Sequence, residues 1–229
     1  MIRVYLRKFG KRIVTVILII GLTSGVGFVS MTFFTLQAIE VEGSGMQVVI
    51  DQKKLTRNLL FFPTEKLRTE LLSQNPLLGD VVIRKKFPHT LVIAAVPRSP
   101  IAHLQTKERK VDIDKEGIVL QESSPDHPLP TLLFDVEPVR TGEKVRDPRV
   151  FSGIAILTAF EGIFPIDVIS SLDSQSLQVK SGILRIYVVQ QSDMKAVATT
   201  LQVLLTGFRI KGTLPAVMDL RFSKPVVTF

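Results

Sequence analysis

One apolar segment near the N-terminus limits the possible folds most strongly. No charged residue lies between Ile13 and Ile39, and 15 of the 24 residues of Ile13–Leu36 are Ile, Val, Leu, Phe or Met. As a helix the segment would be about 36 Å long, and a hydrocarbon core of about 30 Å needs about 20 residues. The sequence therefore predicts a single transmembrane helix at residues 13–36. A cleaved signal peptide is the alternative, but its apolar region would be shorter, and Thr35–Ile39 lacks a small-x-small cleavage site.

The positive charge of the chain is concentrated before this segment. The 229 residues carry 29 Lys and Arg against 21 Asp and Glu, a net charge of +8, and residues 1–12 alone contribute +5. Because Lys and Arg resist translocation, we expect a cytoplasmic tail at 1–12 and an extracytoplasmic part at 37–229, anchored in the inner (plasma) membrane. The remaining +3 provides no cluster of cations for a phosphate backbone, so no nucleic-acid partner is expected.

Two glycines within the apolar segment have the spacing of a helix-packing motif. Gly21 and Gly25 form G-x-x-x-G, which lets two helix backbones approach closely in lipid. Glycine is also common in membrane helices without any such role. The sequence leaves both interpretations open.

The rest of the chain has the pattern of two α+β units, at residues 37–104 and 105–229. The first unit has the order β-α-β-β: a short strand at Ile39–Glu42, a helix from Thr64 to Asn75, and a hairpin of Asp80–Arg84 with Leu91–Val96. The pattern leaves little room for another helix between residues 43 and 62.

The second unit has the pattern of a mixed or antiparallel sheet with two amphipathic helices. The sequence predicts helices over 148–162 and from Met194 to Phe208, the latter with an apolar stripe of period 3.6. A two-residue link, Ser181-Gly182, predicts a hairpin. The last strands are expected at Val217–Phe222 and Lys224–Phe229.

The sequence contains no recognisable catalytic, metal or cofactor site. Cysteine is absent, and His89, His103 and His127 do not have metal-ligand spacing. Asp112 and Asp114 stand two residues apart and could share a face of a strand, but a turn role for Asp114 explains the pair more simply. No phosphate-binding loop or nucleophile elbow is present. We therefore expect a protein without enzymatic activity or cofactor.

The order of the motifs resembles the bacterial cell-division protein family FtsQ/DivIB. The basic tail and apolar segment come first, followed by Ile39–Gly43, which is similar to the opening strand of the family's POTRA domain. Residues 75–78 and 81–93 are similar to that domain's helix end and its strand–Phe-Pro–strand signature. Three further motifs match the family: Pro97–Ala102, the turn Asp114–Gly117, and Met218–Phe222. Pro97 departs from the family, which usually has Glu there, and the short stretch at 43–62 puts the first POTRA helix in doubt.

The resemblance implies a POTRA domain followed by an FtsQ-type β domain in a scaffold of the division machinery. Such proteins bind the coiled-coil division proteins FtsB and FtsL, with other membrane proteins of the septum, and help to regulate septal peptidoglycan synthesis. Strand addition to the last strand is the expected mode of binding. The expected partner-binding residues are Phe222, Lys224, Val226, Val227, Thr228 and Phe229. An ordinary edge strand protected by Lys and Pro is the alternative.

A second partner face is expected at Lys85, Lys86 and His89 in the first unit. Two other functions remain open from the residues alone. One is a POTRA-containing component of envelope secretion or assembly, although the second unit lacks the alternating strands of a barrel. The other is a membrane-anchored extracytoplasmic enzyme.

Overall fold

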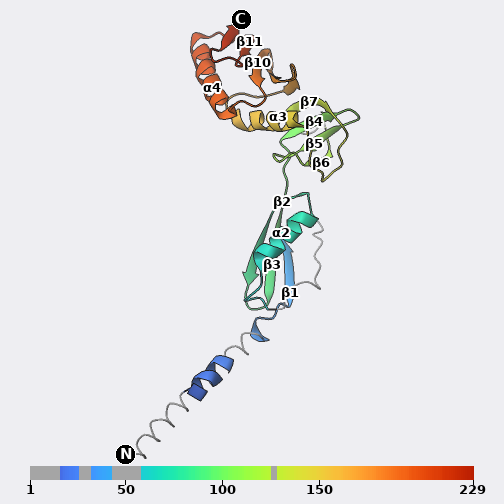
Figure 1. The fold of residues 1–229 in the computed structure, drawn as a ribbon, viewed down its shortest axis with the longest axis vertical. Helices are drawn as coiled ribbons and strands as arrows, with labels where there is room; N and C mark the ends of the chain where they lie inside the picture. The colour runs from blue at the N-terminus through green and yellow to red at the C-terminus, as the bar shows by residue number, and fades with distance from the viewer. Residues whose placement is uncertain (1–15, 26–31, 43–57, 125–127) are drawn as a thin grey trace, which may run out of the picture. The chain divides into compact units, whose positions relative to one another are not determined.

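The computed structural model describes residues 16–25, 32–42, 58–124 and 128–229 (Figure 1). The chain divides into two compact units, Met1–Pro97 and Arg98–Phe229. The basic tail, the expected region of the first POTRA helix at 43–57, and His127 lie outside the described residues.

The prediction of a transmembrane helix at 13–36 is wrong. Residues 16–25 form a helix of ten residues, about 15 Å long, and no helix among the described residues is long and apolar enough to cross a membrane. Hydropathy measures how apolar a segment is, not how far its helix continues. Apart from chain neighbours and the backbone of the same helix, no described atom lies within 4 Å of a Cβ placed on Gly21 or Gly25, so nothing described packs against either glycine.

The first unit is a three-stranded sheet with one described helix packed on it. Strand β1 (Ala38–Glu42) pairs in parallel with β3 (Thr90–Pro97), and β3 pairs antiparallel with β2 (Leu78–Lys86). Helix α2 (Thr64–Gln74) buries Leu67 and Leu71 against the sheet. The order β-α-β-β and the hairpin agree with the sequence prediction. The helix begins at Thr64, and Pro63 occupies the cap position before it.

The second unit is built on a nine-stranded sheet in the order β12-β11-β10-β9-β8-β7-β4-β5-β6. Its parallel pairs are β4·β7, β7·β8 and β10·β11, and all other neighbours are antiparallel. The sheet is therefore mixed, as expected. The strands are β4 (Ala102–Thr106), β5 (Lys110–Ile113), β6 (Val119–Glu122), β7 (Thr131–Val136), β8 (Val168–Ser171), β9 (Ser176–Ser181), β10 (Leu184–Val189), β11 (Val217–Asp219) and β12 (Val226–Thr228).

Two helices pack against this sheet, α3 (Pro148–Ala159) and α4 (Met194–Lys211). The Asp193 side chain caps α4 by accepting from the backbone N–H groups of Lys195 and Ala196, and Gly212 ends the helix with φ +69°. The buried stripe of α4 meets alternate residues of the strands, such as Ile186 and Met218. Burial of a side chain of this size stabilises a fold by about 1.5–3 kcal/mol, so the stripe is a main source of stability.

The predicted turn at Asp114–Gly117 is held by side-chain hydrogen bonds. Asp114 Oδ1 accepts from the backbone N–H groups of Glu116 and Ile118, and Gly117 takes φ +77°. The Arg98 guanidinium donates to the other Asp114 oxygen and to Glu116 Oε2 at 2.8 Å. Asp114 is thus a turn residue, as the sequence predicted, and Arg98 ties the start of the second unit to this turn.

Candidate partner-binding edge

The β6 end of the nine-stranded sheet is closed by a loop of the same unit. The loop pairs with residues before and within β6: Val119 N donates to Glu143 O at 3.0 Å, and Gly142 N donates to Val119 O at 2.8 Å. Ile118 forms an isolated antiparallel bridge with Lys144. These bonds occupy backbone groups that an edge strand otherwise leaves free.

The β12 end is open. In the described part of the chain β12 pairs only with β11, through Asp219 with Val226, Met218 with Val227, and Val217 with Thr228. An open edge presents unpaired N–H and C=O groups that can pair with a strand from another chain.

The backbone of β12 offers particular groups to such a strand. The Thr228 carbonyl accepts from Ala216 N at 2.8 Å, so the polar groups of Thr228 face β11. Because these groups alternate in direction along an antiparallel strand, those of Val227 face the open side. Pro225 also faces that side but has no N–H, so it limits how far a partner ladder extends toward the N-terminal end of β12.

Apolar side chains surround this open edge. Phe222 is 60% exposed, Val226 55% and Phe229 71%. The Phe229 ring packs edge-on against Phe208 of α4, with 5.6 Å between ring centroids. Val227 is paired with the fully buried Met218 and so points to the same face of the sheet, the face that α4 covers. A strand added to β12 would extend the apolar layer beneath the end of α4.

The Asp219–Arg221 pair lies directly before β12 and is part of a larger charge cluster. Arg221 Nη2 donates to Asp219 Oδ2 at 2.7 Å, and Arg221 Nη1 lies 3.6 Å from Asp173 Oδ2. The guanidinium also lies over the rings of Tyr187 and Phe222, each 5.6 Å from the centroid. The hydrogen bond from Arg221 holds the pKa of Asp219 below its ordinary value. This cluster fixes the turn that leads the chain into β12.

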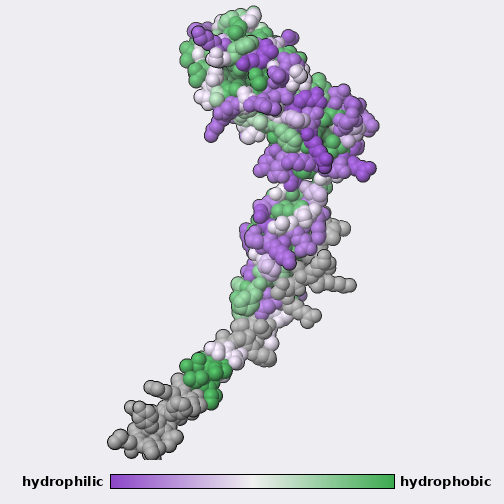
Figure 2. All heavy atoms as spheres, viewed as in Figure 1, coloured by the Kyte–Doolittle hydropathy of each residue, from purple (hydrophilic) through white to green (hydrophobic). Residues whose placement is uncertain are grey.

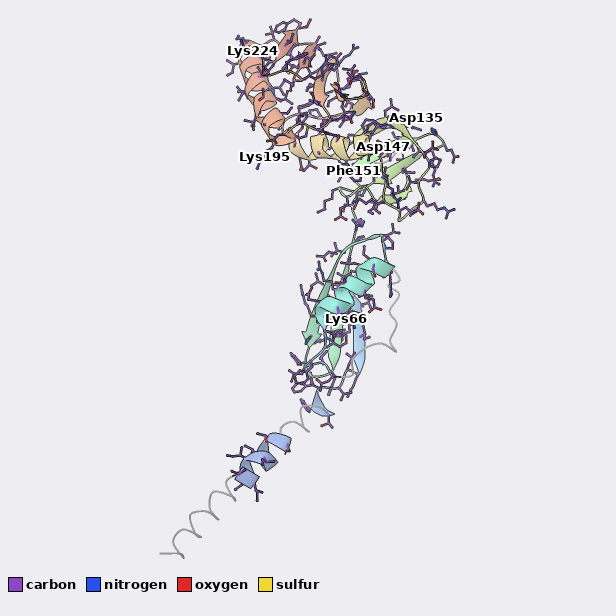
Figure 3. All side chains as sticks on the ribbon, in the orientation of Figure 1. Lys66, Asp135, Asp147, Phe151, Lys195 and Lys224 are labelled. Atoms are coloured by element: carbon purple, nitrogen blue, oxygen red, sulfur yellow. The ribbon has the colours of Figure 1, made fainter. Side chains whose placement is uncertain are left out.

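Cations are placed beside the open edge. Lys224 is exposed and makes no ion pair among the described residues, and Arg209 and Lys211 occupy the last turn of α4. In Figure 3 Lys224 lies near the C-terminal end of α4 and Lys195 near its start. The edge therefore has a positive rim that complements an acidic partner.

The second predicted face, Lys85, Lys86 and His89, lies at the β2–β3 turn of the first unit. Lys86 Nζ is 3.1 Å from Glu40 Oε2, and Lys85 Nζ donates to Leu60 O at 2.9 Å. His89 Nδ1 is 3.2 Å from Thr35 O. The three side chains are thus brought to one end of the unit, where they tie the turn to other segments of the chain.

A buried polar network was not predicted from the sequence. His103 Nδ1 is 2.7 Å from Asp112 Oδ1, and the Ser123 hydroxyl lies 2.7 Å from the same nitrogen and donates to Asp112 Oδ1 at 2.6 Å. In a nucleophilic triad the serine and the carboxylate contact opposite ring nitrogens, whereas here both contact Nδ1. The network therefore joins β4, β5 and the end of β6 and does not have the geometry of a triad.

Asp112 in this network is ionised at a lower pH than an ordinary aspartate. Burial alone would raise its pKa, but hydrogen bonds from Ser123, Gln121 and His103 outweigh burial and lower the pKa. A carboxylate that accepts several hydrogen bonds is stabilised in its charged form.

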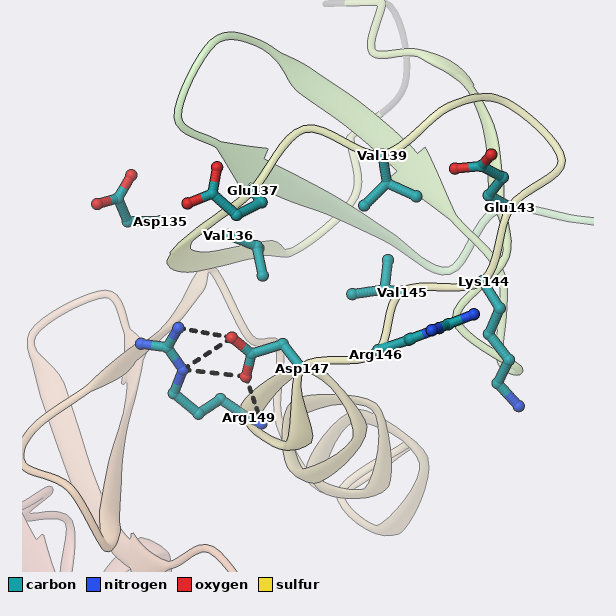
Figure 4. Close-up of a pocket in the computed structure, with 10 residues that line it drawn as sticks. All are labelled: Asp135, Val136, Glu137, Val139, Glu143, Lys144, Val145, Arg146, Asp147 and Arg149. Atoms are coloured by element: carbon teal, nitrogen blue, oxygen red, sulfur yellow. Dashed lines mark hydrogen bonds and ion pairs between the residues drawn. The ribbon is translucent and has the colours of Figure 1, made fainter.

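A charged cleft of about 670 Å³ lies between the end of β7 and the start of α3 (Figure 4). Arg149 binds the Asp147 carboxylate with two nitrogens, the shorter contact being 2.6 Å, and this lowers the pKa of Asp147. Glu137 pairs with Lys107. These charges are satisfied by each other. The residues that line the cleft are Asp135, Val136, Glu137, Val139, Glu143, Lys144, Val145, Arg146, Asp147 and Arg149. Among the described residues, no three His, Asp or Glu side chains gather as a metal site would require.

Comparison with known proteins finds two relatives that carry the same name. The chain is 27% identical to the "Cell division protein DivIB" of Clostridium acetobutylicum over 96 residues, which are 40% of this chain and 38% of that protein. It is 29% identical to the "Cell division protein DivIB" of Clostridium botulinum over 94 residues, 39% of this chain and 37% of that protein. These matches support the FtsQ/DivIB family. The matched region spans less than two fifths of either DivIB relative, and no family model matches the chain.

Proposed function

We propose that this chain acts in cell division as a non-enzymatic scaffold that holds other division proteins at the septum. The similarity to two DivIB proteins supports a role in division. The open edge of β12 is the observation that carries the mode of action, because it is the end of the large sheet that the described chain leaves unpaired.

The partner contributes an extended segment that adds a tenth strand beside β12. Its backbone pairs with the outward groups of Val227 and with the N–H of Phe229, and its apolar side chains contact Phe229 and Phe208. Acidic residues beside that segment meet Lys224 and the end of α4. The partner class is a coiled-coil division protein of the FtsB or FtsL type, and by holding such partners the chain would help to regulate septal peptidoglycan synthesis.

The first experiment places a fluorescent protein before Met1 of the full chain and follows it in dividing cells. We expect accumulation at the septum. A uniform signal from a stably expressed fusion would contradict the division role.

The second experiment separates the mode of binding from the cellular role. The full chain and a variant lacking Lys224–Phe229 are each used to capture the FtsB-type protein of the same cell. We expect capture by the full chain only. Equal capture by both would contradict strand addition at β12 while leaving a role in division intact.

A further inference from the structure

Three segments of the first unit that are distant in sequence meet at the end of the β2–β3 hairpin. Leu59 N donates to Phe34 O at 2.7 Å, and Gln37 N donates to His89 O at 2.9 Å. The Lys85 ammonium reaches Leu60 O. Residues 32–37, 58–62 and the turn between β2 and β3 therefore form one connected surface.

This surface is apolar and aromatic. The rings of Phe33 and Phe34 pack edge-on at 5.3 Å between centroids, and Phe34 packs on Phe87 at 5.6 Å. Outward-facing side chains remain in spite of these contacts. Their exposed fractions are 54% for Phe33, 39% for Leu60, 69% for Phe61 and 52% for Phe87. We refer to these four residues as the aromatic tip, and Figure 2 shows apolar atoms at this end of the unit.

We propose that the aromatic tip is a membrane-contacting surface and that its ligand is an anionic lipid bilayer. Phe and Leu side chains beside basic residues bury at the boundary between headgroups and acyl chains, and nearby Lys residues favour anionic lipid by about 1 kcal/mol each. Lys85 and Lys86 directly precede Phe87 in the sequence. Glu40 neutralises part of the Lys86 charge, whereas Lys85 contacts only a carbonyl among the described residues.

The residues that precede the tip in the sequence support lipid, rather than a protein, as its ligand. The described helix at 16–25 is uncharged and has six large apolar side chains more than half exposed, and Figure 2 shows apolar atoms on the visible face of this helix. They are Val16, Ile17, Leu18, Ile19, Ile20 and Leu22. Phe33 follows Gly25 by eight residues, a distance of at most about 28 Å. One bilayer surface can therefore receive both apolar regions, without any requirement that the helix crosses it.

This inference gives the second predicted face, Lys85, Lys86 and His89, a lipid ligand. It does not depend on the β12 edge, so either proposal can fail alone.

The test uses the absence of cysteine in the chain, which makes any introduced cysteine unique. The full-length variants Phe61→Cys and Phe87→Cys are labelled with the environment-sensitive dye NBD. Gln74→Cys is the matched control because Gln74 is the last residue of α2 and lies far from the tip. Strand β2 begins four residues later, at Leu78, and spans about 27 Å before it reaches the tip. Circular dichroism confirms that each variant is folded.

The labelled chains are mixed with vesicles of phosphatidylcholine and phosphatidylglycerol that carry spin-labelled lipid. We expect quenching at positions 61 and 87 to exceed that at position 74 by about threefold or more, because only the tip enters the interface. The double substitution Lys85→Glu and Lys86→Glu should reduce quenching in anionic vesicles and leave it unchanged in pure phosphatidylcholine.

Two results would overturn the proposal. The first is that the chain does not float with the vesicles, or that it floats with them but shows equal quenching at positions 61, 74 and 87. The second is protection of position 87 that requires an added division protein rather than lipid, which would assign the tip to a protein partner.

Discussion

The two ends of the nine-stranded sheet differ in how their edges are protected. At β6 the chain folds back and pairs with its own edge, and the buried network of His103, Asp112 and Ser123 holds the neighbouring strands together. At β12 the edge is three residues long, is exposed, and is guarded only by Lys224 and Pro225. Short edges with Lys and Pro avoid indiscriminate pairing while remaining available to a matched strand. The difference suggests that one end serves stability and the other serves binding.

Removal of Lys224–Phe229 is the change with the largest expected effect on this comparison. It deletes the open edge itself, so affinity for the partner should fall by about 100-fold or more, which is at least about 2.7 kcal/mol. Isothermal titration of the full-length proteins measures this loss. The first unit should keep its fold, because β12 has no part in its sheet.

Asp112→Asn tests the closed end. The substitution replaces a buried carboxylate that accepts three hydrogen bonds, so the free energy of unfolding of the second unit should fall by about 2 kcal/mol, whereas partner affinity should not change. Chemical denaturation gives the first value. The exposed Asp135→Asn is the control and should have little effect. A loss of partner binding in folded Asp112→Asn would contradict the separation of the two ends.

The same substitution has a signature in acid. The folded pKa of Asp112 lies below its unfolded value of about 3.9. The stability that ionised Asp112 contributes is therefore present above about pH 4 and is lost as the pH falls through the lower folded pKa. Unfolding curves recorded between neutral and acidic pH should be flatter for Asp112→Asn than for the unchanged protein. Parallel curves would contradict the role of the ionised carboxylate.

The sequence predicted features that depend on neighbouring residues better than features that depend on contacts between distant residues. The β9–β10 hairpin and helix α4 were predicted correctly because turn chemistry and a 3.6-residue stripe are local signals, although the two linking residues are Gly182 and Ile183 rather than Ser181 and Gly182. The expected strand Val217–Phe222 is shorter in the structure, since Arg221 N donates to Asp219 Oδ1 and bends the chain after Asp219. The prediction of a transmembrane helix was wrong because the apolar composition of a segment does not determine the length of its helix.

The long-range features of the sites were beyond the sequence patterns. His103, Asp112 and Ser123 come together only through the register of β4 with β5 and of β5 with β6. Similarly, the prediction of a terminal edge strand did not reveal that the backbone N–H and C=O of Val227 face the open side or that the Phe229 ring packs against Phe208. The partner role of the six predicted residues remains a prediction.

Val227→Pro tests the contribution of a single backbone hydrogen bond at the open end. It removes an N–H that faces away from β11, so partner affinity should fall about tenfold, or about 1.4 kcal/mol, while the pairing with β11 remains. Val227→Ala is the matched control because it shortens the side chain and keeps the N–H. Equal affinities of the two folded variants would argue against a backbone ladder at this position.

Lys224→Glu should have the smallest effect. An exposed charge at the rim changes the association rate more than the final affinity, so we expect association about three- to fivefold slower, with a weaker dependence on salt. Stopped-flow or surface plasmon resonance measures the rate. Lys195→Glu makes the same charge change near the other end of α4 and should leave the rate nearly unchanged; a similar slowing would indicate a general effect of net charge.

Hydrogen exchange of the β12 amides tests the central claim most directly. The full-length chain is compared with and without the proposed FtsB-type partner, with resolution of single residues. Strand addition predicts that the amides of Val227 and Phe229 become protected when the partner binds, whereas the amide of Thr228, which already faces β11, changes little. Partner binding that leaves Val227 and Phe229 exchanging as in the free protein would contradict the account.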